Sequence, residues 1–292
     1  MLKIIRYLAE SILAKSAYWV FRLLPFNVAS SMGGVIGRTL GPLSSRDKLA
    51  RKNLQRAIPD LDKKQVDEII TGMWDNLGRT VAEFPRMNDM DKHAFAKIVE
   101  VEGVEHIEQA KQSAKGSLFF SGHIGNWEMA PKTVAIHDCP LGLVYRQGNN
   151  PEVDKLIQKM RGHYQSEGIP KGKGGSRQLI KILRQAGHIG ILVDQKMNEG
   201  IAVDFFGRKV MTAPAIALLA LKYECPVIAT RVIRTEGAHF KVTIFPAMEI
   251  EKTGDSEMDV LNLMTRISKV IEDWIKDNPS QWIWVHNRWP DE

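Results

Sequence analysis

The sequence contains little cysteine and no recognisable metal-binding or esterase motif. Its two cysteines, Cys139 and Cys225, are each followed by proline, so the chain offers no disulfide framework and fits a reducing compartment. The 8 histidines are scattered without a His-Glu-x-x-His or Cys-x-x-Cys pattern, which disfavours a metal hydrolase. The absence of a Gly-x-Ser-x-Gly elbow disfavours a serine esterase. We therefore expect no metal and no bound cofactor.

Long apolar runs are also missing. Within the first 24 residues, charged side chains interrupt every window before it reaches the ~18 to 20 apolar residues that a membrane span needs. No clean apolar core with a small-residue cleavage site indicates a signal peptide. Projected on a helix, one side of this segment is apolar and the opposite side is charged. The apolar side carries Ile4, Ile5, Leu8, Ile12, Trp19 and Leu23. Residues 1–24 are therefore predicted to be an amphipathic helix, which either lies in a membrane interface or packs on the protein surface.

The composition is that of a globular protein. The chain has 292 residues, of which 44% are hydrophobic, enough for one large core or two smaller ones. Its net charge of +6 favours an anionic partner. Nucleic acid, anionic lipid and an acidic carrier protein all satisfy that charge, so charge alone leaves the partner open.

The pattern of apolar residues predicts an α/β fold. Residues 25–100 indicate a helical layer, and from residue 101 to 292 short apolar runs alternate with helical segments. The runs expected to be strands are residues 117–120, 141–145, 189–193, 226–233 and 240–245. The helices expected between and after them are residues 128–137, 151–166, 176–186, 213–223 and 258–277. We expect a mixed sheet flanked by helices, preceded by the helical layer and the amphipathic helix.

The segment SGHIGNWEMAP, residues 121–131, is the strongest candidate for a catalytic site. The apolar run before it predicts a buried strand, and Pro131 predicts a helix that starts near Glu128. Residues five apart lie about 140° apart on one helix, so His123 and Glu128 meet only if the intervening turn folds back. On that condition we predict His123 as a general base and Glu128 as the carboxylate that orients its ring. Backbone N–H groups of residues 125–127 are the expected oxyanion donors.

Polar residues also follow the neighbouring strands. Arg146 closes the run LGLVYR, Asp194 and Gln195 follow the third run, and Arg231 lies in the fourth. Ligands of open α/β sheets bind at the carboxyl ends of the strands, so we expect these groups to converge with His123. We assign Arg146, Asp194, Gln195 and Arg231 to substrate binding, together with Asn126 at the corner of the turn.

At this point the sequence resembles the late acyltransferases of lipid A biosynthesis, the lauroyl and myristoyl transferases of the wider glycerolipid acyltransferase superfamily. HIGNWE resembles the family's HX4E motif, and LGLVYR resembles a block in which an arginine binds an anionic part of the acceptor. The segments VDQKMNEGIAVDFFGRKVMTAPA, CPVIATRVIR and PSQWIWVHNRWP resemble its later blocks, and RKNLQRAIP and VEGVEHIEQA extend the similarity upstream. The resemblance covers most of the chain.

The resemblance implies a glycerol-3-phosphate-acyltransferase-like fold and an O-acyltransferase. The reaction is transfer of a fatty acyl chain from acyl carrier protein to a hydroxyl of a Kdo-containing lipid A precursor, by direct attack without an acyl-enzyme. The expected location is the cytoplasmic face of the inner membrane, with peripheral or monotopic attachment. A basic region between the second and third runs is a candidate dock for the acidic carrier protein, or an ordinary solvated helix face. It contains Lys155, Lys159, Arg161, Lys171, Lys173, Arg177, Lys181 and Arg184.

Two alternatives remain at this stage. One is an acyltransferase that uses an acyl-CoA donor and another glycolipid, such as a phosphatidylinositol mannoside. The other is a basic membrane-surface or nucleic-acid-binding protein without enzymatic activity. We favour the lipid A hypothesis, with no nucleic-acid partner, because a non-enzymatic protein does not explain the spacing of His123 and Glu128.

Overall fold

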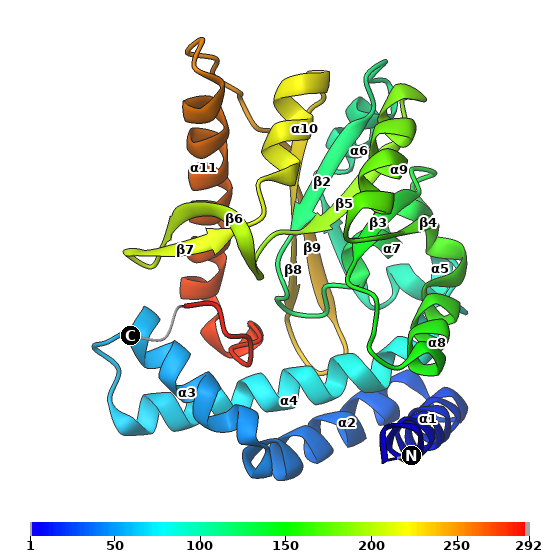
Figure 1. Cartoon of the computed structure of the whole chain (residues 1–292). Helices are drawn as coiled ribbons and strands as arrows, with labels where there is room; N and C mark the ends of the chain where they lie inside the picture. Colours follow the sequence, from blue (N-terminus) through cyan, green and yellow to red (C-terminus); the bar gives the residue numbers. More distant parts are fainter. Residues whose placement is uncertain (1, 290–292) are drawn as a thin grey trace.

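A central sheet organises the molecule (Figure 1). The computed structural model describes residues 2–289, without the side chains of residues 2, 163, 165, 166 and 173. In spatial order the seven strands are β1 (Val99–Glu102), β9 (Phe240–Ala247), β8 (Val227–Arg234), β2 (Ser117–Ser121), β5 (His188–Leu192), β3 (Leu141–Tyr145) and β4 (Gln165–Pro170). All neighbours run parallel except β8 and β9, which are antiparallel. The predicted mixed α/β sheet is confirmed.

Helices cover both faces of this sheet, because successive side chains of a strand point to opposite faces. Leu118 and Phe120 of β2 belong to a core cluster with three helices of one face. Phe119 between them belongs to a second cluster with helices of the other face. The first face carries α9 (Lys173–Arg184), α10 (Ala215–Tyr223) and α11 (Ser256–Asp277), and the second carries α5 (Lys92–Ala96), α6 (Val104–Lys111) and α7 (Met129–Ile136). The fully buried β2 therefore lies at the centre of the core.

A helical layer lies across the carboxyl ends of the central strands (Figure 1). It consists of α1 (Leu2–Leu23), α2 (Phe26–Leu40), the 3₁₀ turn η1 (Gly41–Leu43), α3 (Ser45–Ala57) and α4 (Lys63–Met87). Helices α2 and α4 cross at glycines, and a Cβ atom at Gly37 would lie 2.0 Å from the carbonyl oxygen of Trp74. Asn76 and Thr80 of α4 donate hydrogen bonds to the carbonyl oxygen of Gly125, at 2.9 and 3.3 Å. The layer is thus bonded directly to the turn that carries His123.

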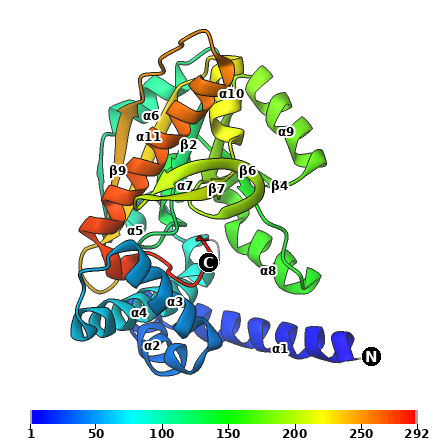
Figure 2. The same ribbon diagram turned by 60° about the vertical axis from the view of Figure 1, so that its left-hand side comes forward.

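Helix α1 extends outward from this layer (Figure 2). Its inner side packs on α4 and on α8 (Pro151–Arg161), where Tyr18 and Phe21 are buried. Its predicted apolar side faces outward, with Leu8 61% and Leu23 78% exposed. No described helix is long and apolar enough to cross a membrane. The described residues leave out Met1, at the start of the first predicted helix. They also leave out residues 290–292, which include the end of the segment PSQWIWVHNRWP. The domain boundaries at residues 24 and 100 remain a prediction.

The secondary structure differs from the prediction in three segments, of which the first is the unpredicted edge strand β1 at residues 99–102. The helix predicted over residues 151–166 ends at Arg161, because Gly162 adopts a positive φ of 36° that breaks the helix. A 3₁₀ turn, η2 (Gly162–Tyr164), and the edge strand β4 follow it. Residues 196–212 form an unpredicted hairpin of β6 (Lys196–Phe205) and β7 (Arg208–Thr212). The first residues of β6 are exposed on both faces, so they show no alternation of apolar and polar residues. Only Val203 and Phe205, near the end of the strand, are buried.

Candidate active site

His123 lies in a rigid turn after β2. The turn passes through Gly125, whose φ of 59° and close approach to the backbone of Val232 both require glycine. Ile124 forms a bridge with Trp282, and the N–H of Ile283 donates to the carbonyl oxygen of His123 at 3.2 Å. The carboxy-terminal segment therefore helps to hold the turn in place.

Asp194 is the hydrogen-bond partner of the His123 ring. Strands β2 and β5 are parallel neighbours with Ser121 opposite Leu192, so the residues two positions beyond each, His123 and Asp194, lie side by side. Oδ1 of Asp194 is 2.7 Å from Nδ1 of His123. Its Oδ2 accepts hydrogen bonds from the backbone N–H of His123 and from the indole N–H of Trp282, both at 2.7 Å.

This environment keeps Asp194 ionised. Burial alone would raise the pKa of the carboxyl group, but the adjacent His123 and the hydrogen bonds from His123 and Trp282 outweigh burial and hold the pKa far below its usual range. The Asp194 side chain has no exposed surface, so it cannot contact a substrate as predicted. Its position instead allows it to fix the proton of His123 on Nδ1 and leave Nε2 as a base.

The predicted contact between His123 and Glu128 is wrong. Both ring nitrogens of His123 have other partners, Asp194 at Nδ1 and Gln195 at Nε2. Glu128 accepts two hydrogen bonds from Arg161, at 2.6 and 3.1 Å, and one from the hydroxyl of Tyr164 at 2.9 Å. Glu128 is already in helical conformation at the start of α7, which directs its carboxylate toward α8 and η2 instead of back to the strand.

The Glu128 and Arg161 pair is buried and charged. Burial opposes ionisation of Glu128, yet the Arg161 guanidinium and the Tyr164 hydroxyl outweigh it, and the pKa of Glu128 is lowered. Reciprocally, burial would lower the pKa of Arg161, but the Glu128 carboxylate raises it. Arg161 was predicted as part of a docking surface, but its side chain lies in the interior and pairs with Glu128.

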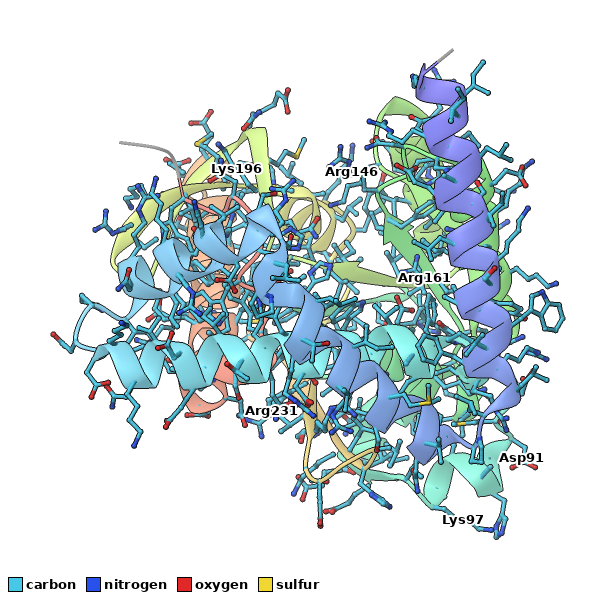
Figure 3. All side chains as sticks on the ribbon, turned by 90° about the horizontal axis from the view of Figure 1, so that it is seen from below. Asp91, Lys97, Arg146, Arg161, Lys196 and Arg231 are labelled. Carbon is cyan, nitrogen blue, oxygen red and sulfur yellow. The ribbon has the colours of Figure 1, made fainter. Side chains whose placement is uncertain are left out.

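The Nε2 side of His123 faces a cavity of about 200 Å³. Arg146 at the end of β3 and Lys171 after β4 line it, together with Trp127 and Gln195. Neither Arg146 nor Lys171 has an acidic partner among the described residues, and burial lowers the pKa of Lys171. Figure 3 shows Arg146 and Arg161 on the side of β3, β4 and α8, with Lys196 on the side of β6. Asp154 also lines the cavity, and its carboxylate accepts a hydrogen bond from the N–H of Gly148. The cavity thus joins the His123 ring to two unpaired cations, an arrangement suited to an anionic substrate.

A second, apolar cavity adjoins the first. It has a volume of about 50 Å³ and lies between α7 and strands β2, β3 and β5. Trp127, Val144, Arg161 and Leu192 line both cavities. An apolar group that enters beside His123 therefore meets a hydrocarbon-lined space within the core.

Two predicted substrate-binding residues lie elsewhere. Asn126 is fully buried, and its amide donates to Glu83 at 2.7 Å, so its function is to hold the turn on α4. Arg231 does not line the cavity; it pairs with Asp277 at 3.9 Å and lies over the ring of Phe245. Figure 3 shows Arg231 on the other side of α4 from Arg146. It points away because Thr230, the preceding residue of β8, already faces α7 and the apolar cavity.

Sequence reasoning missed the hydrogen bond of Trp282 to Asp194 and the position of His286, a candidate acceptor-binding residue, beside His123. Trp282 binds Asp194, and the ring of His286 lies 5.4 Å from the ring of His123, centroid to centroid. Both belong to the carboxy-terminal segment, roughly 160 residues after His123, so no local spacing indicates the contact. The described residues contain no group of three or more His, Cys, Asp or Glu side chains that could hold a metal ion.

Comparison with known proteins identifies the family. The model of the bacterial lipid A biosynthesis acyltransferases matches residues 2–291. The lipid A biosynthesis palmitoleoyltransferase of Escherichia coli (strain K12) is 23% identical over 275 residues, 92% of this chain and 87% of that protein. The phosphatidylinositol mannoside acyltransferase of Mycobacterium tuberculosis (strain CDC 1551 / Oshkosh) is 22% identical over 254 residues, 82% and 76% of the two proteins.

Among solved structures, the 1-acyl-sn-glycerophosphate acyltransferase PlsC of Thermotoga maritima aligns with a TM-score of 0.41 and 11% identity, over 88% of this chain and 96% of that one. That likeness is too distant to support a conclusion. The family model, by contrast, spans almost the entire sequence. The chain therefore belongs to the bacterial lipid A biosynthesis acyltransferase family, and it is an acyltransferase.

Proposed function

We propose that this acyltransferase moves a fatty acyl chain from acyl carrier protein to a hydroxyl of a Kdo-containing lipid A precursor, at the cytoplasmic face of the inner membrane. The observation that carries the mechanism is the His123 ring, held through Nδ1 by the buried Asp194 and directed through Nε2 toward a cationic cavity. Nε2 takes the proton of the acceptor hydroxyl as its oxygen attacks the thioester carbonyl. When the C–S bond breaks, the imidazolium returns that proton to the departing thiolate.

The charges of the cavity support an anionic acceptor. Arg146 and Lys171 line the cavity together with the base, and neither has an acidic partner in the described part of the chain. A phosphate or sugar carboxylate of the acceptor would bind between them and place its neighbouring hydroxyl at Nε2 of His123. The adjoining apolar cavity would receive part of the acyl chain of the donor.

A row of cations on α9 supports an acidic protein as donor. Arg177, Lys181 and Arg184 are exposed at helical spacing and form no ion pair within the described residues. Long-range attraction to such a row speeds the encounter with an acidic carrier protein. Lys173, at the start of the same helix, has a side chain outside the described part of the structure.

Activity measurements with purified enzyme test this function directly. Transfer of radiolabelled acyl chains would be compared for acyl carrier protein and CoA donors, with a Kdo-containing lipid A precursor and a phosphatidylinositol mannoside as acceptors. We expect the carrier protein and the lipid A precursor to give the highest kcat/KM. Mass spectrometry of lipid A from a deletion strain should show loss of one secondary acyl chain. Preference for the mannoside and CoA would instead support the alternative glycolipid reaction, and mixed DNA or RNA binding without transfer would contradict both.

Removal of either cavity cation should weaken acceptor binding. We expect Arg146→Ala and Lys171→Ala each to raise KM for the acceptor about 10-fold with a smaller change in kcat, since a hydrogen bond to a charged group contributes about 1.5–3 kcal/mol. Lys171→Arg should recover part of the loss. Lys64→Ala, which removes an exposed lysine on α4, is the matched control. An unchanged KM in both cavity variants would show that the anionic part of the acceptor binds elsewhere.

The outward face of the helical layer supports attachment to a membrane surface. The exposed apolar side chains of α1 continue onto α2 and η1 through Val28, Met32, Val35, Ile36, Leu40 and Leu43. Lys3 lies on the same layer and favours anionic headgroups, and the ion-paired Arg6, Lys15 and Arg38 lie there too. We infer that α1 and α2 together lie in the membrane interface.

Flotation with anionic liposomes measures this attachment. We expect the double variant Leu8→Ser and Ile12→Ser to float markedly less than the wild-type chain, because it removes exposed apolar surface from the centre of α1. The control, Leu218→Ser with Met258→Ser, removes comparably exposed apolar side chains from α10 and α11. Equal flotation of both double variants would contradict the role of α1.

A further inference from the structure

The side chain of Gln195 lies between two imidazole rings at the centre of the site. Its amide nitrogen is 3.2 Å from Nε2 of His123 and 3.0 Å from Nε2 of His286. An amide NH₂ group carries two hydrogens, so one group can donate to both rings at once. Gln195 also lines the cavity in which the base lies.

Proton positions on both rings agree with this geometry. The ionised Asp194 accepts the Nδ1–H of His123, which leaves a lone pair on Nε2 and requires the amide to present its nitrogen. Burial, followed by the nearby His123, lowers the pKa of His286 to about 4. His286 is therefore neutral at pH 7, and its Nε2 is free to accept the second hydrogen of Gln195.

His286 is held firmly from behind. Asn53 of α3, which is fully buried, donates to the carbonyl oxygens of Trp284 at 2.7 Å and of His286 at 2.5 Å. The N–H of Arg288 donates to the same His286 carbonyl at 2.8 Å. Arg288 itself is buried and bonded to the carbonyl of Met211 and the hydroxyl of Thr212. The segment is thus a fixed wall of the site and not a mobile tail.

One of the oxyanion donors expected from the sequence is engaged elsewhere. The backbone N–H of Gly125 donates to the carbonyl oxygen of Gln281 at 3.1 Å. Farther along the turn, the backbone N–H of Glu128 donates to the side-chain oxygen of Asn126 at 3.3 Å. The Gln195 side chain, in contrast, lines the cavity, and its amide donates one hydrogen to the ring of the base itself.

We propose that Gln195 donates a hydrogen bond to the oxyanion of the tetrahedral intermediate, and that His286 is a positioning residue that holds its amide for this task. This inference deepens the acyl transfer proposed above and rests on it. The amide now occupies the hydrogen-bonding position at Nε2 of His123 that the acceptor hydroxyl needs. Binding of the hydroxyl turns that N–H toward the adjacent thioester carbonyl, while the other N–H stays on His286.

The step is balanced without any further reagent. The acceptor oxygen forms a bond to the carbonyl carbon as its proton moves to Nε2 of His123, and the carbonyl electron pair moves onto the oxygen that Gln195 stabilises. Collapse of the intermediate restores the C=O bond and breaks the C–S bond. The proton on His123 then moves to the thiolate, which leaves the amide hydrogen bonded to a neutral ester carbonyl.

Steady-state kinetics of single and double variants test the proposal. Gln195→Ala should lower kcat about 10²-fold, the usual loss for one oxyanion donor, with KM changed only a few-fold. His286→Ala should lower kcat by a smaller factor, about 10-fold. His286→Gln, whose carbonyl can accept the same hydrogen, should recover much of that loss. The double variant Gln195→Ala with His286→Ala should match Gln195→Ala alone, because His286 acts only through the amide.

The controls separate this inference from the proposed function. His93→Ala, at an exposed histidine of α5, should leave kcat unchanged, and thermal melting checks that each variant folds. If His286→Ala does not fold, Gln195→Ala and His286→Gln still decide the matter. Multiplied losses in the double variant, a change in KM alone, or wild-type kcat in Gln195→Ala would overturn the inference. Absence of transfer by the wild-type enzyme would instead indicate failure of the proposed function.

Discussion

Replacing His123 with alanine is expected to lower kcat for acyl transfer by about 10⁴-fold, the upper range for loss of a positioned general base. The imidazole is the group whose Nε2 faces the cavity while its Nδ1 is held by Asp194. The variant should still fold, because Asp194 keeps the backbone N–H of residue 123 and the indole of Trp282 as donors. Acyl transfer from labelled acyl carrier protein measures the effect.

The matched control for this variant is His239→Ala, which removes an exposed histidine between β8 and β9. It should retain wild-type kcat and the wild-type melting temperature. Near wild-type turnover in His123→Ala, with the control unchanged, would exclude His123 as the base. A large loss confined to KM would assign the ring to binding and not to proton transfer.

Asp194→Asn is expected to approach the effect of His123→Ala, with a loss of kcat up to about 10⁴-fold. The asparagine oxygen can still accept from Trp282 and from the backbone of His123, so the fold should persist. Its amide nitrogen would then donate to Nδ1, which forces the proton of the neutral ring onto Nε2 and removes the base. The double variant His123→Ala with Asp194→Asn should be no slower than His123→Ala alone, since both act through one ring.

Glu128→Gln provides the comparison that separates the two carboxylates. This change leaves Arg161 buried without its carboxylate, and loss of one partner of a buried pair costs about 3–5 kcal/mol of stability. We therefore expect Glu128→Gln to lower the free energy of unfolding, and Asp194→Asn to lower kcat with little loss of stability. The reverse outcome, a stable but inactive Glu128→Gln beside an active Asp194→Asn, would restore Glu128 as the residue that orients the base.

Much of the fold is readable from the sequence because its strands are short apolar runs between breaking residues. Leu141–Tyr145 has the predicted bounds, and the first helix exposes the apolar side that was expected. The errors lie where local signals compete. The sequence pattern of a helix continues from Pro151 past Gly162, but in the structure the positive φ of Gly162 ends the helix. The start of β6 is exposed on both sides and gives no alternation to detect.

The sequence predicted many of the residues of the candidate site, but not which of their side chains contact one another. His123, Arg146, Asp194 and Gln195 all lie where strand ends meet, as expected from their position after apolar runs. Asn126 and Arg231 were assigned to the same place, but side-chain direction within a turn or a strand decides whether a residue reaches the cavity. Asn126 turns inward to Glu83, and Arg231 lies on the opposite side of β8 from Thr230.

The sequence by itself determined which residues stand at the strand ends, because apolar runs and glycines mark where each strand stops. It also predicted that His123 and two carboxylates, Glu128 and Asp194, lie near one another. Only the tertiary structure decided which carboxylate serves His123. Parallel pairing of β2 with β5 sets Asp194 against the ring, while the first turn of α7 directs Glu128 to Arg161. Strand order and helix direction arise from contacts between distant segments, and the local spacing of His123 and Glu128 contains no information about them.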